Sequence, residues 1–206
     1  DTVTIDEPGE ITAVPGPTTD ALCFGTGDGK AQVSVADGTP GYTYLWTGVN
    51  PAHTSTMPAP NDLFADTYDL KITDANSCEK TFDLNMVIGQ PEAITVAVLV
   101  TDVLCNGLST GEIDITPDKG TPPYTFLWPG AGVVPGSEDQ TGLAAGLYNV
   151  TVTDFNGCEK ITSNIEITEN DLIEASFLIS DLSCNDSGDG AIATTMSGGV
   201  APFTYS

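Results

Sequence analysis

Residues 120–158 read GTPPYTFLWPGAGVVPGSEDQTGLAAGLYNVTVTDFNGC, and the same pattern occurs elsewhere in the chain. A first copy spans 38–78, beginning GTPGYTYLW and ending DLFADTYDLKITDANSC, and a third begins at Gly199 as GVAPFTYS. Trp46 and Trp128, which occupy matching positions, are 82 residues apart. A fixed period of this size indicates a tandem array of one small domain.

Each complete copy ends in an alternating segment that predicts a half-buried strand, a tight turn and a second strand. In the second copy these segments are 147–153, 154–157 and 158–167. The first alternates apolar with polar residues, and the turn ends in Asn-Gly, which favours a hairpin. In the second copy a glycine turn precedes Tyr148, and Tyr68 repeats this arrangement in the first copy, with Asp66 in place of the glycine; such a tyrosine is typical of the tyrosine corner of β-sandwiches.

The chain is therefore predicted to be all-β, a tandem of immunoglobulin-like (PKD-like) β-sandwich repeats of about 80 residues. Trp46 and Trp128 end the third strand of their copies and are predicted core residues. No helix is expected. The predicted strands of the second copy are 92–104, 112–117, 124–128, 132–136, 138–142, 147–153 and 158–167.

Four segments follow from the period. They are 1–8, the last strand of a preceding repeat; 9–90 and 91–170, two complete repeats; and 171–206, the start of a further, truncated repeat. The junctions between repeats have almost no linker length, which favours a stiff rod over flexibly connected domains.

The motif G-T-P-P-Y-T-F-L-W, then L-A-A-G-L-Y-N-V-T-V-T-D, then N-G-C resembles the SprB-type repeat of very large surface adhesins in gliding bacteria that use type IX secretion. The resemblance covers both complete copies and the start of a third. It implies an extracellular, cell-surface segment that forms the stalk or filament of an adhesin for attachment or gliding. The implied partners are neighbouring repeats of the same long chain. Other filament copies, surface polysaccharide and cell-envelope motility proteins are further candidates.

The composition excludes some functions and favours an extracellular location. The chain has 29 acidic residues, five lysines and no arginine, giving a net charge of −24. Nucleic acid is excluded as a partner because nothing can neutralise its phosphates. No apolar run approaches the ~18 residues that a membrane span needs, so no membrane insertion is expected.

Five cysteines recur at matched positions without a Cys-x-x-Cys pair, which indicates disulfides and an oxidising compartment. Pairing within repeats would join Cys23 with Cys78 and Cys105 with Cys158. In an alternating sandwich, however, the early and late cysteines of one repeat lie at opposite ends of strands ~17–20 Å long, whereas a disulfide needs Cα atoms within about 7 Å. Pairing between repeats would join Cys23 with Cys158, and Cys105 would pair with a cysteine beyond Ser206. Both pairings remain open.

Polar side chains also recur around the turns. They can cap the turns, or they can contribute to calcium sites completed at a domain junction, since one Asp-x-Asn-Gly turn offers two or three of the six to eight oxygens that calcium takes. No cofactor is required, and calcium is the candidate ion. The candidate ligands are Asp74, Asn76, Glu79, Asp154, Asn156, Glu159, Asp186 and Asp189.

His53 is the single histidine and lies in a proline-rich loop that differs between the copies. Without a second histidine, a free thiol or a recurring serine partner, no catalytic triad can be assembled, so we predict that the chain is not an enzyme. The alternative function is a calcium- or polysaccharide-binding accessory module of a secreted enzyme, in which Trp46 and Trp128 would stack on sugars.

Overall fold

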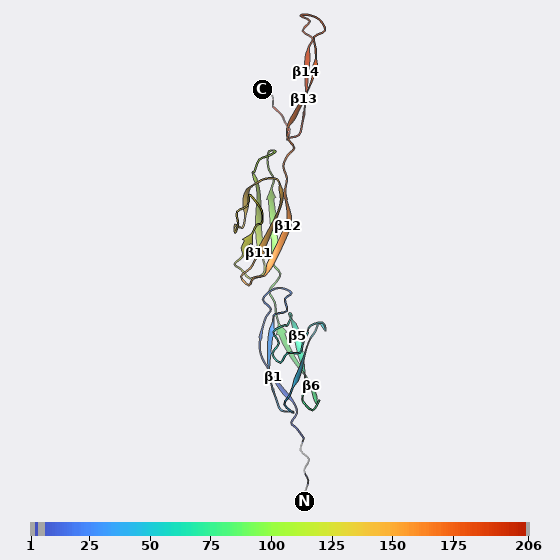
Figure 1. Cartoon of the computed structure of the whole chain (residues 1–206), viewed down its shortest axis with the longest axis vertical. Helices are drawn as coiled ribbons and strands as arrows, with labels where there is room; N and C mark the ends of the chain where they lie inside the picture. The colour runs from blue at the N-terminus through green and yellow to red at the C-terminus, as the bar shows by residue number, and fades with distance from the viewer. Residues whose placement is uncertain (1–2, 4–6, 205–206) are drawn as a thin grey trace. The chain divides into compact units, whose positions relative to one another are not determined.

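The computed structural model describes Val3 and residues 7–204, and every regular element within them is a β-strand (Figure 1). The all-β prediction is confirmed. The predicted strand at 1–8 falls largely outside the described residues. The chain forms two compact units: the first contains Asp1–Ile94, Lys119–Pro123 and Asp154–Cys158, and the second contains Thr95–Asp118, Tyr124–Thr153 and Glu159–Ser206.

The first repeat is a sandwich of two antiparallel sheets. One sheet pairs β1 with β2, and the other has the order β4-β3-β5-β6. The polar and apolar residues alternate along these strands, so each sheet has one face for the core. The strands are β1 (Thr12–Thr19), β2 (Lys30–Ala36), β3 (Thr43–Gly48), β4 (Thr54–Ser55), β5 (Asp66–Thr73) and β6 (Glu79–Ile88).

The second repeat has two three-stranded sheets, with the orders β10-β8-β7 and β12-β11-β9. The third copy contributes the hairpin β13 (Glu174–Ser180) and β14 (Ala191–Ser197), whose side chains are nearly all exposed. The strands of the second repeat are β7 (Thr95–Thr101), β8 (Gly111–Asp118), β9 (Thr125–Leu127), β10 (Gln140–Leu143), β11 (Gly146–Thr153) and β12 (Glu159–Ile167).

The predicted strand at 132–136 is wrong, because this segment is a loop. Gly132 and Gly136 have φ angles of 80° and 79°, which extended backbone does not adopt. The Gln140 side chain takes the place of a neighbouring strand: its Oε1 accepts the Val134 N–H at 2.7 Å, and its Nε2 donates to the Val134 carbonyl at 2.9 Å.

The core of the first repeat lies between its two sheets. Tyr68, Leu70 and Ile72 alternate along β5 and are buried, and Trp46 of β3 has no exposed surface. Burial of each such side chain stabilises the fold by about 1.5–3 kcal/mol. In the second repeat Trp128 is likewise buried, together with Ile113, Ile115, Val150 and Val152.

Both repeats contain the predicted tyrosine corner. The Tyr68 hydroxyl donates to the Phe64 carbonyl at 3.1 Å, and the Tyr148 hydroxyl donates to the Ala144 carbonyl at 2.9 Å, four residues upstream in each case. Next to each tyrosine the register between the last two strands shifts, as in a β-bulge. These features, with two sheets around a buried tryptophan, confirm the immunoglobulin-like fold class.

The two cysteine-bearing segments of the first repeat lie at opposite ends of β2. Cys23 is in the loop that precedes β2, whereas Cys78 ends the turn between β5 and β6. That turn contacts the residues that follow β2, because the Asp74 carboxylate accepts the Thr39 N–H at 3.0 Å. Seven residues of strand separate the two ends by about 20 Å.

Candidate functional site

The β1–β2 loop holds Cys23 through local hydrogen bonds. Asp28 Oδ1 accepts the Leu22 N–H at 3.1 Å, on the residue before the cysteine. Gly25 has a φ angle of 73°, which glycine tolerates at no steric cost, and donates its N–H to Gln90 Oε1 at 2.6 Å. Gln90 follows the last strand of the repeat, so the loop is fixed to the end of its own domain.

The turn between β11 and β12 is built around the carboxylate of Asp154, which is 5% exposed. Its Oδ1 accepts the N–H groups of Asn156 and Cys158, both at 2.9 Å, and its Oδ2 accepts the Thr121 N–H at 2.9 Å. The Asn156 amide also donates to Thr121 Oγ1 at 3.1 Å. Hydrogen bonds to an ionised acceptor are the stronger kind, so this turn presents Cys158 in a defined position.

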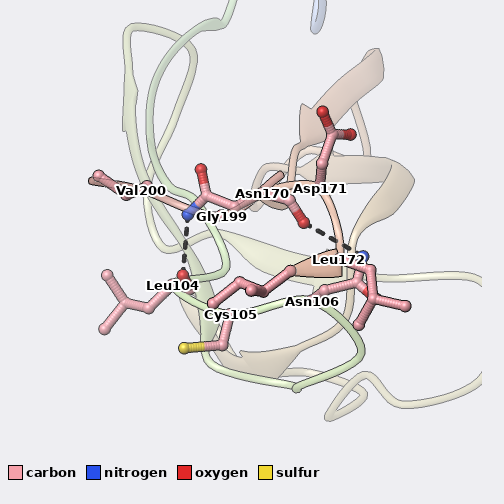
Figure 2. Close-up of a pocket in the computed structure, with 9 residues that line it drawn as sticks. Leu104, Cys105, Asn106, Asn170, Asp171, Leu172, Gly199 and Val200 are labelled. Carbon is pink, nitrogen blue, oxygen red and sulfur yellow. Dashed lines mark hydrogen bonds between the residues drawn. The ribbon is translucent and has the colours of Figure 1, made fainter. Parts of the chain in front are cut away.

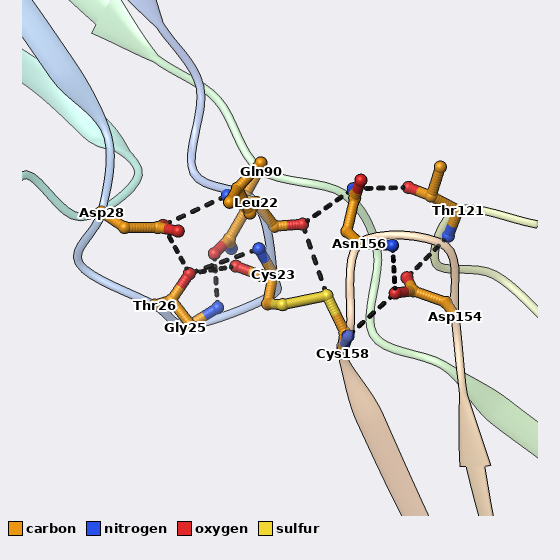
Figure 3. The surroundings of a disulfide bond; sticks show 10 residues. All are labelled: Leu22, Cys23, Gly25, Thr26, Asp28, Gln90, Thr121, Asp154, Asn156 and Cys158. Carbon is orange, nitrogen blue, oxygen red and sulfur yellow. Dashed lines mark hydrogen bonds between the residues drawn. A yellow bond between two sulfur atoms is a disulfide. The ribbon is translucent and has the colours of Figure 1, made fainter.

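The loop and the turn, which both belong to the first compact unit, meet at a disulfide between Cys23 and Cys158 (Figure 3). The S–S bond is 2.02 Å, the Cα atoms are 5.5 Å apart, and 135 residues separate the two cysteines in sequence. The Leu22 carbonyl accepts a hydrogen bond from Asn156 Nδ2 at 3.2 Å. Of the two pairings that the sequence left open, the structure contains the one between repeats.

The other two cysteine loops have the same backbone arrangement. The N–H of Leu104 donates to Thr110 Oγ1 at 3.3 Å, and the N–H of Ser183 donates to Asp189 Oδ1 at 3.0 Å, which matches the Leu22 bond in the first copy. Asp186 has a φ angle of 65°, like the glycine in the equivalent position of the first loop. The cysteines of these two loops, Cys105 and Cys184, are free and exposed.

The Asp74–Cys78 turn repeats the Asp154–Cys158 turn, and its thiol is also free and exposed. Asp74 Oδ1 accepts the N–H groups of Asn76 and Cys78, both at 2.9 Å, and the Asn76 amide donates to Thr39 Oγ1 at 2.8 Å. The N–H groups of Thr39 and Cys78 hold the pKa of Asp74 below its usual value. The part of the chain that the structure describes thus contains two copies of the turn and three of the loop.

The remaining candidate carboxylates have other contacts. Glu79 forms an ion pair of 2.7 Å with Lys71, whereas Glu159 is exposed. Hydrogen bonds led by those from Ser183 hold the pKa of Asp189 far below its usual value. Within the described residues no group of three or more acidic, histidine or cysteine side chains is placed to hold a metal. Calcium binding stays a prediction.

His53 is an anchor for its own loop. Its ring stacks on Phe64 with 4.9 Å between the ring centres, and its Nδ1 lies 3.0 Å from Asp66 Oδ2. Burial raises the pKa of Asp66, but hydrogen bonds from the backbone of Asn50 and Thr67 and from His53 outweigh it and lower the pKa overall. These contacts pin the proline-rich loop to the start of β5.

Two kinds of residue at the joint are missing from the sequence analysis. One is the threonine of the Gly-Thr pair, Thr39 or Thr121, whose N–H donates to the carboxylate of the turn and whose Oγ1 accepts a hydrogen bond from the asparagine amide. The other is the acceptor after the last strand, Gln90 or Glu169, which binds the glycine N–H two residues after the cysteine. Their recurrence at matched positions was the available signal.

The two sheets, the buried tryptophans and the cysteine joint define the class as a tandem immunoglobulin-like repeat protein. The family model of the SprB repeat matches residues 16–51, 97–133 and 176–206, which together make up half of the chain. The chain therefore belongs to the SprB repeat family, and the resemblance found in the sequence is confirmed.

Among solved structures, the chain is similar to the C-terminal 282-residue fragment of intimin, crystallised with the intimin-binding domain of the translocated intimin receptor. The identity is 14%, the TM-score is 0.38, and the match covers 82% of this chain and 67% of the fragment. No curated protein matches the chain. In the described part of the chain no helix has the length and apolarity to cross a membrane.

Proposed function

We propose that this chain is a structural segment of an extracellular surface adhesin or filament. Its repeats form a stiff, disulfide-stabilised stalk for attachment or gliding motility, and its partners are neighbouring repeats of the same protein. Other filament copies, surface polysaccharide and cell-envelope motility proteins are further candidate partners. The single observation that carries this proposal is the disulfide between Cys23 and Cys158.

The proposal rests on the path that tension takes through the chain. Force applied to the ends of the polypeptide reaches Cys23, crosses the disulfide to Cys158 and bypasses the 135-residue separation between them. Strands β2 to β11 lie in the segment between the two cysteines, which the force does not cross. A covalent shortcut of this kind protects most of two domains from mechanical unfolding, which is the property that a load-bearing stalk needs.

Two further properties fit an extracellular stalk. Disulfides persist in oxidising environments, which supports an extracellular location. The net charge of −24 keeps a long repetitive surface solvated and discourages association between chains. By contrast, Trp46 and Trp128 are buried at 0% and 2% exposure, so these two side chains are not available to stack on a sugar, as the alternative of a polysaccharide-binding module requires.

Single-molecule stretching tests the proposal. The chain is held by its two ends and pulled under oxidising and reducing conditions. Reduction should release up to about 480 Å of additional contour length, since 135 residues contribute about 3.6 Å each. Cys23→Ser should show the long contour without reductant, whereas Cys105→Ser should behave as the wild type. Equal contour lengths in oxidised wild type and Cys23→Ser would refute the load-bearing role.

A further inference from the structure

A pocket of about 320 Å³ opens beside the free thiol of Cys105, within the second compact unit (Figure 2). One wall is the cysteine loop, with Leu104 and Cys105. The other walls are the segment after β12, with Asn170, and the start of the third copy, with Gly199 and Val200. The pocket is therefore formed where one repeat ends and the next begins.

The matching place in the first compact unit is filled. Leu22 and Cys23 correspond to Leu104 and Cys105, and Gly120 corresponds to Gly199. There the space is taken by the Asp154–Cys158 turn, which approaches so closely that a Cβ on Gly120 would lie 2.9 Å from Asp154 Oδ2.

The backbone that surrounds this space is the same in both places. The Gly120 N–H donates to the Glu92 carbonyl at 3.1 Å, and the Gly199 N–H donates to the Asp171 carbonyl at 2.9 Å. The φ angles of Gly120 and Gly199 are 68° and 59°. The pocket at Cys105 is thus a formed copy of an occupied site.

We propose that the pocket at Cys105 is a receptor for an Asp-x-Asn-x-Cys hairpin turn from a further repeat of this family, which it binds through hydrogen bonds and then through a disulfide. The proposal deepens the proposed function, because it names the partner that extends the stalk. We infer the bound segment from the equivalent place in the first unit, where Leu22, Cys23 and Thr121 hold the Asp154–Cys158 turn.

A second pocket, of about 280 Å³, is the complementary half of the joint. It lies beside the free thiol of Cys78 and is lined by Asp74 of the turn and by Pro8, Gly9 and Ile11 of the segment before β1. In the first unit the matching segment and turn, around Asp154, contact the Leu22–Cys23 loop. The described residues therefore contain one joint closed by a disulfide, one pocket beside the free thiol of a loop and one pocket beside the free thiol of a turn.

The chemistry of the receptor predicts which contacts contribute most. The Val200 N–H corresponds to the Thr121 N–H and can donate a hydrogen bond to the carboxylate of an incoming aspartate. Valine has no hydroxyl, so the second acceptor for the incoming asparagine, which Thr121 Oγ1 provides in the closed joint, is missing at Val200. The Leu104 carbonyl accepts a hydrogen bond from Asn170 Nδ2 at 2.8 Å and has a second lone pair for the incoming asparagine. The aspartate should therefore contribute more to recognition than the asparagine.

The covalent step is thiol–disulfide exchange with an activated disulfide. The Cys105 thiolate attacks the sulfur of a turn cysteine that carries an aromatic thiol as a mixed disulfide. A new S–S bond forms, the old one breaks, and the aromatic thiolate leaves with the electron pair. No other oxidant is consumed.

The test uses the whole chain and a peptide copied from residues 153–160, TDFNGCEK, activated as its thionitrobenzoate mixed disulfide. Labelling of Cys105 and Cys184 is followed over time by peptide mass spectrometry. The two cysteines lie in separate loops with the same hydrogen-bond pattern. Every residue of the Cys184 loop is exposed, so Cys184 is an internal control. We expect Cys105 to react about tenfold faster, the effect of roughly one charge-assisted hydrogen bond.

Matched peptides and variants separate recognition from simple thiol reactivity. Replacing the aspartate of the peptide by alanine should bring the two rates within about twofold, and replacing the asparagine should have a smaller effect. Val200→Thr restores the missing acceptor and should raise the Cys105 rate, whereas Val200→Ala should not.

A rate ratio near one for the native peptide, or one unchanged by the alanine peptides, overturns the proposal. These rates do not depend on whether the Cys23–Cys158 bond carries load, so this inference and the stalk function can fail separately.

Discussion

Loss of the Cys23–Cys158 disulfide should strongly destabilise each repeat, and Cys23→Ser is the variant that removes it. With the first repeat folded, the Cys23 loop is fixed beside Gln90 through the Gly25 hydrogen bond of 2.6 Å. Unfolding of the second repeat alone then leaves a closed loop from Gln90 to Cys158, about 70 residues long. The chain-entropy model assigns about 4 kcal/mol to a closed loop of this length, and about 5 kcal/mol if both repeats unfold together.

Urea unfolding at neutral pH without reductant measures this difference. Fluorescence follows both repeats, because Trp46 and Trp128 are buried one in each. A loss of about 4 kcal/mol should lower the urea midpoint of the variant by at least about 1 M. Cys105→Ser is the control, since its thiol is free and exposed, and it should stay within about 0.5 kcal/mol of the wild type.

The reasoning would be refuted by a loss below about 1 kcal/mol in Cys23→Ser, provided that peptide mapping shows the bond intact in the wild type. Such a result would mean that the repeats separate at the joint before either unfolds, or that the unfolded chain is already compact enough for the loop to cost little.

Three further predictions follow from contacts within single repeats. Trp46→Ala empties the centre of the first core and should cost about 3–5 kcal/mol in urea unfolding; a cost under 1 kcal/mol would contradict the packing described. Tyr148→Phe leaves a carbonyl without its hydroxyl donor and should cost about 1 kcal/mol by the same measurement, and no cost would show that water replaces the hydroxyl. N–H groups of Thr39 and Cys78 lower the pKa of Asp74 in the folded state, so the Asp74 carboxylate stabilises the fold above its unfolded pKa near 4, and this stabilisation is lost as the pH falls. In urea unfolding between pH 5 and 2, the wild type should therefore lose stability more steeply than Asp74→Asn. Parallel profiles of the two proteins would contradict this role of Asp74.

Local patterns in the sequence were enough to predict the repeats and most strands. The alternation in 147–153 and the Asn-Gly turn after it are fixed by neighbours in the chain, and β11 and β12 formed where the pattern placed them. The predicted strand at 132–136 was wrong because its apolar residues suggested a strand, whereas its backbone is set by glycines at positive φ and by hydrogen bonds between Val134 and the side chain of Gln140, six residues further on.

The joint was less accessible from the sequence because its members lie far apart in the chain. Thr121 and Asp154 are 33 residues apart, and Leu22 and Asn156 are 134 apart. The expected strand length indicated that Cys23 could not reach Cys78, whereas secreted domains usually form their disulfides within one domain, which favoured that pair. Only the position of the turn in space decides between such pairings, and no local pattern encodes it.

The long separation of the bonded cysteines also sets an order of events during biogenesis. A chain made from its N-terminus exposes Cys23 first, then Cys78 and Cys105, and only after them its true partner, Cys158. A thiol oxidase acting on the unfolded chain would meet the wrong pairs sooner. Once the first domain has folded, Cys78 is held at the far end of β2, about 20 Å away, and can no longer pair with Cys23. Correct pairing therefore requires that the first domain folds before its cysteines are oxidised.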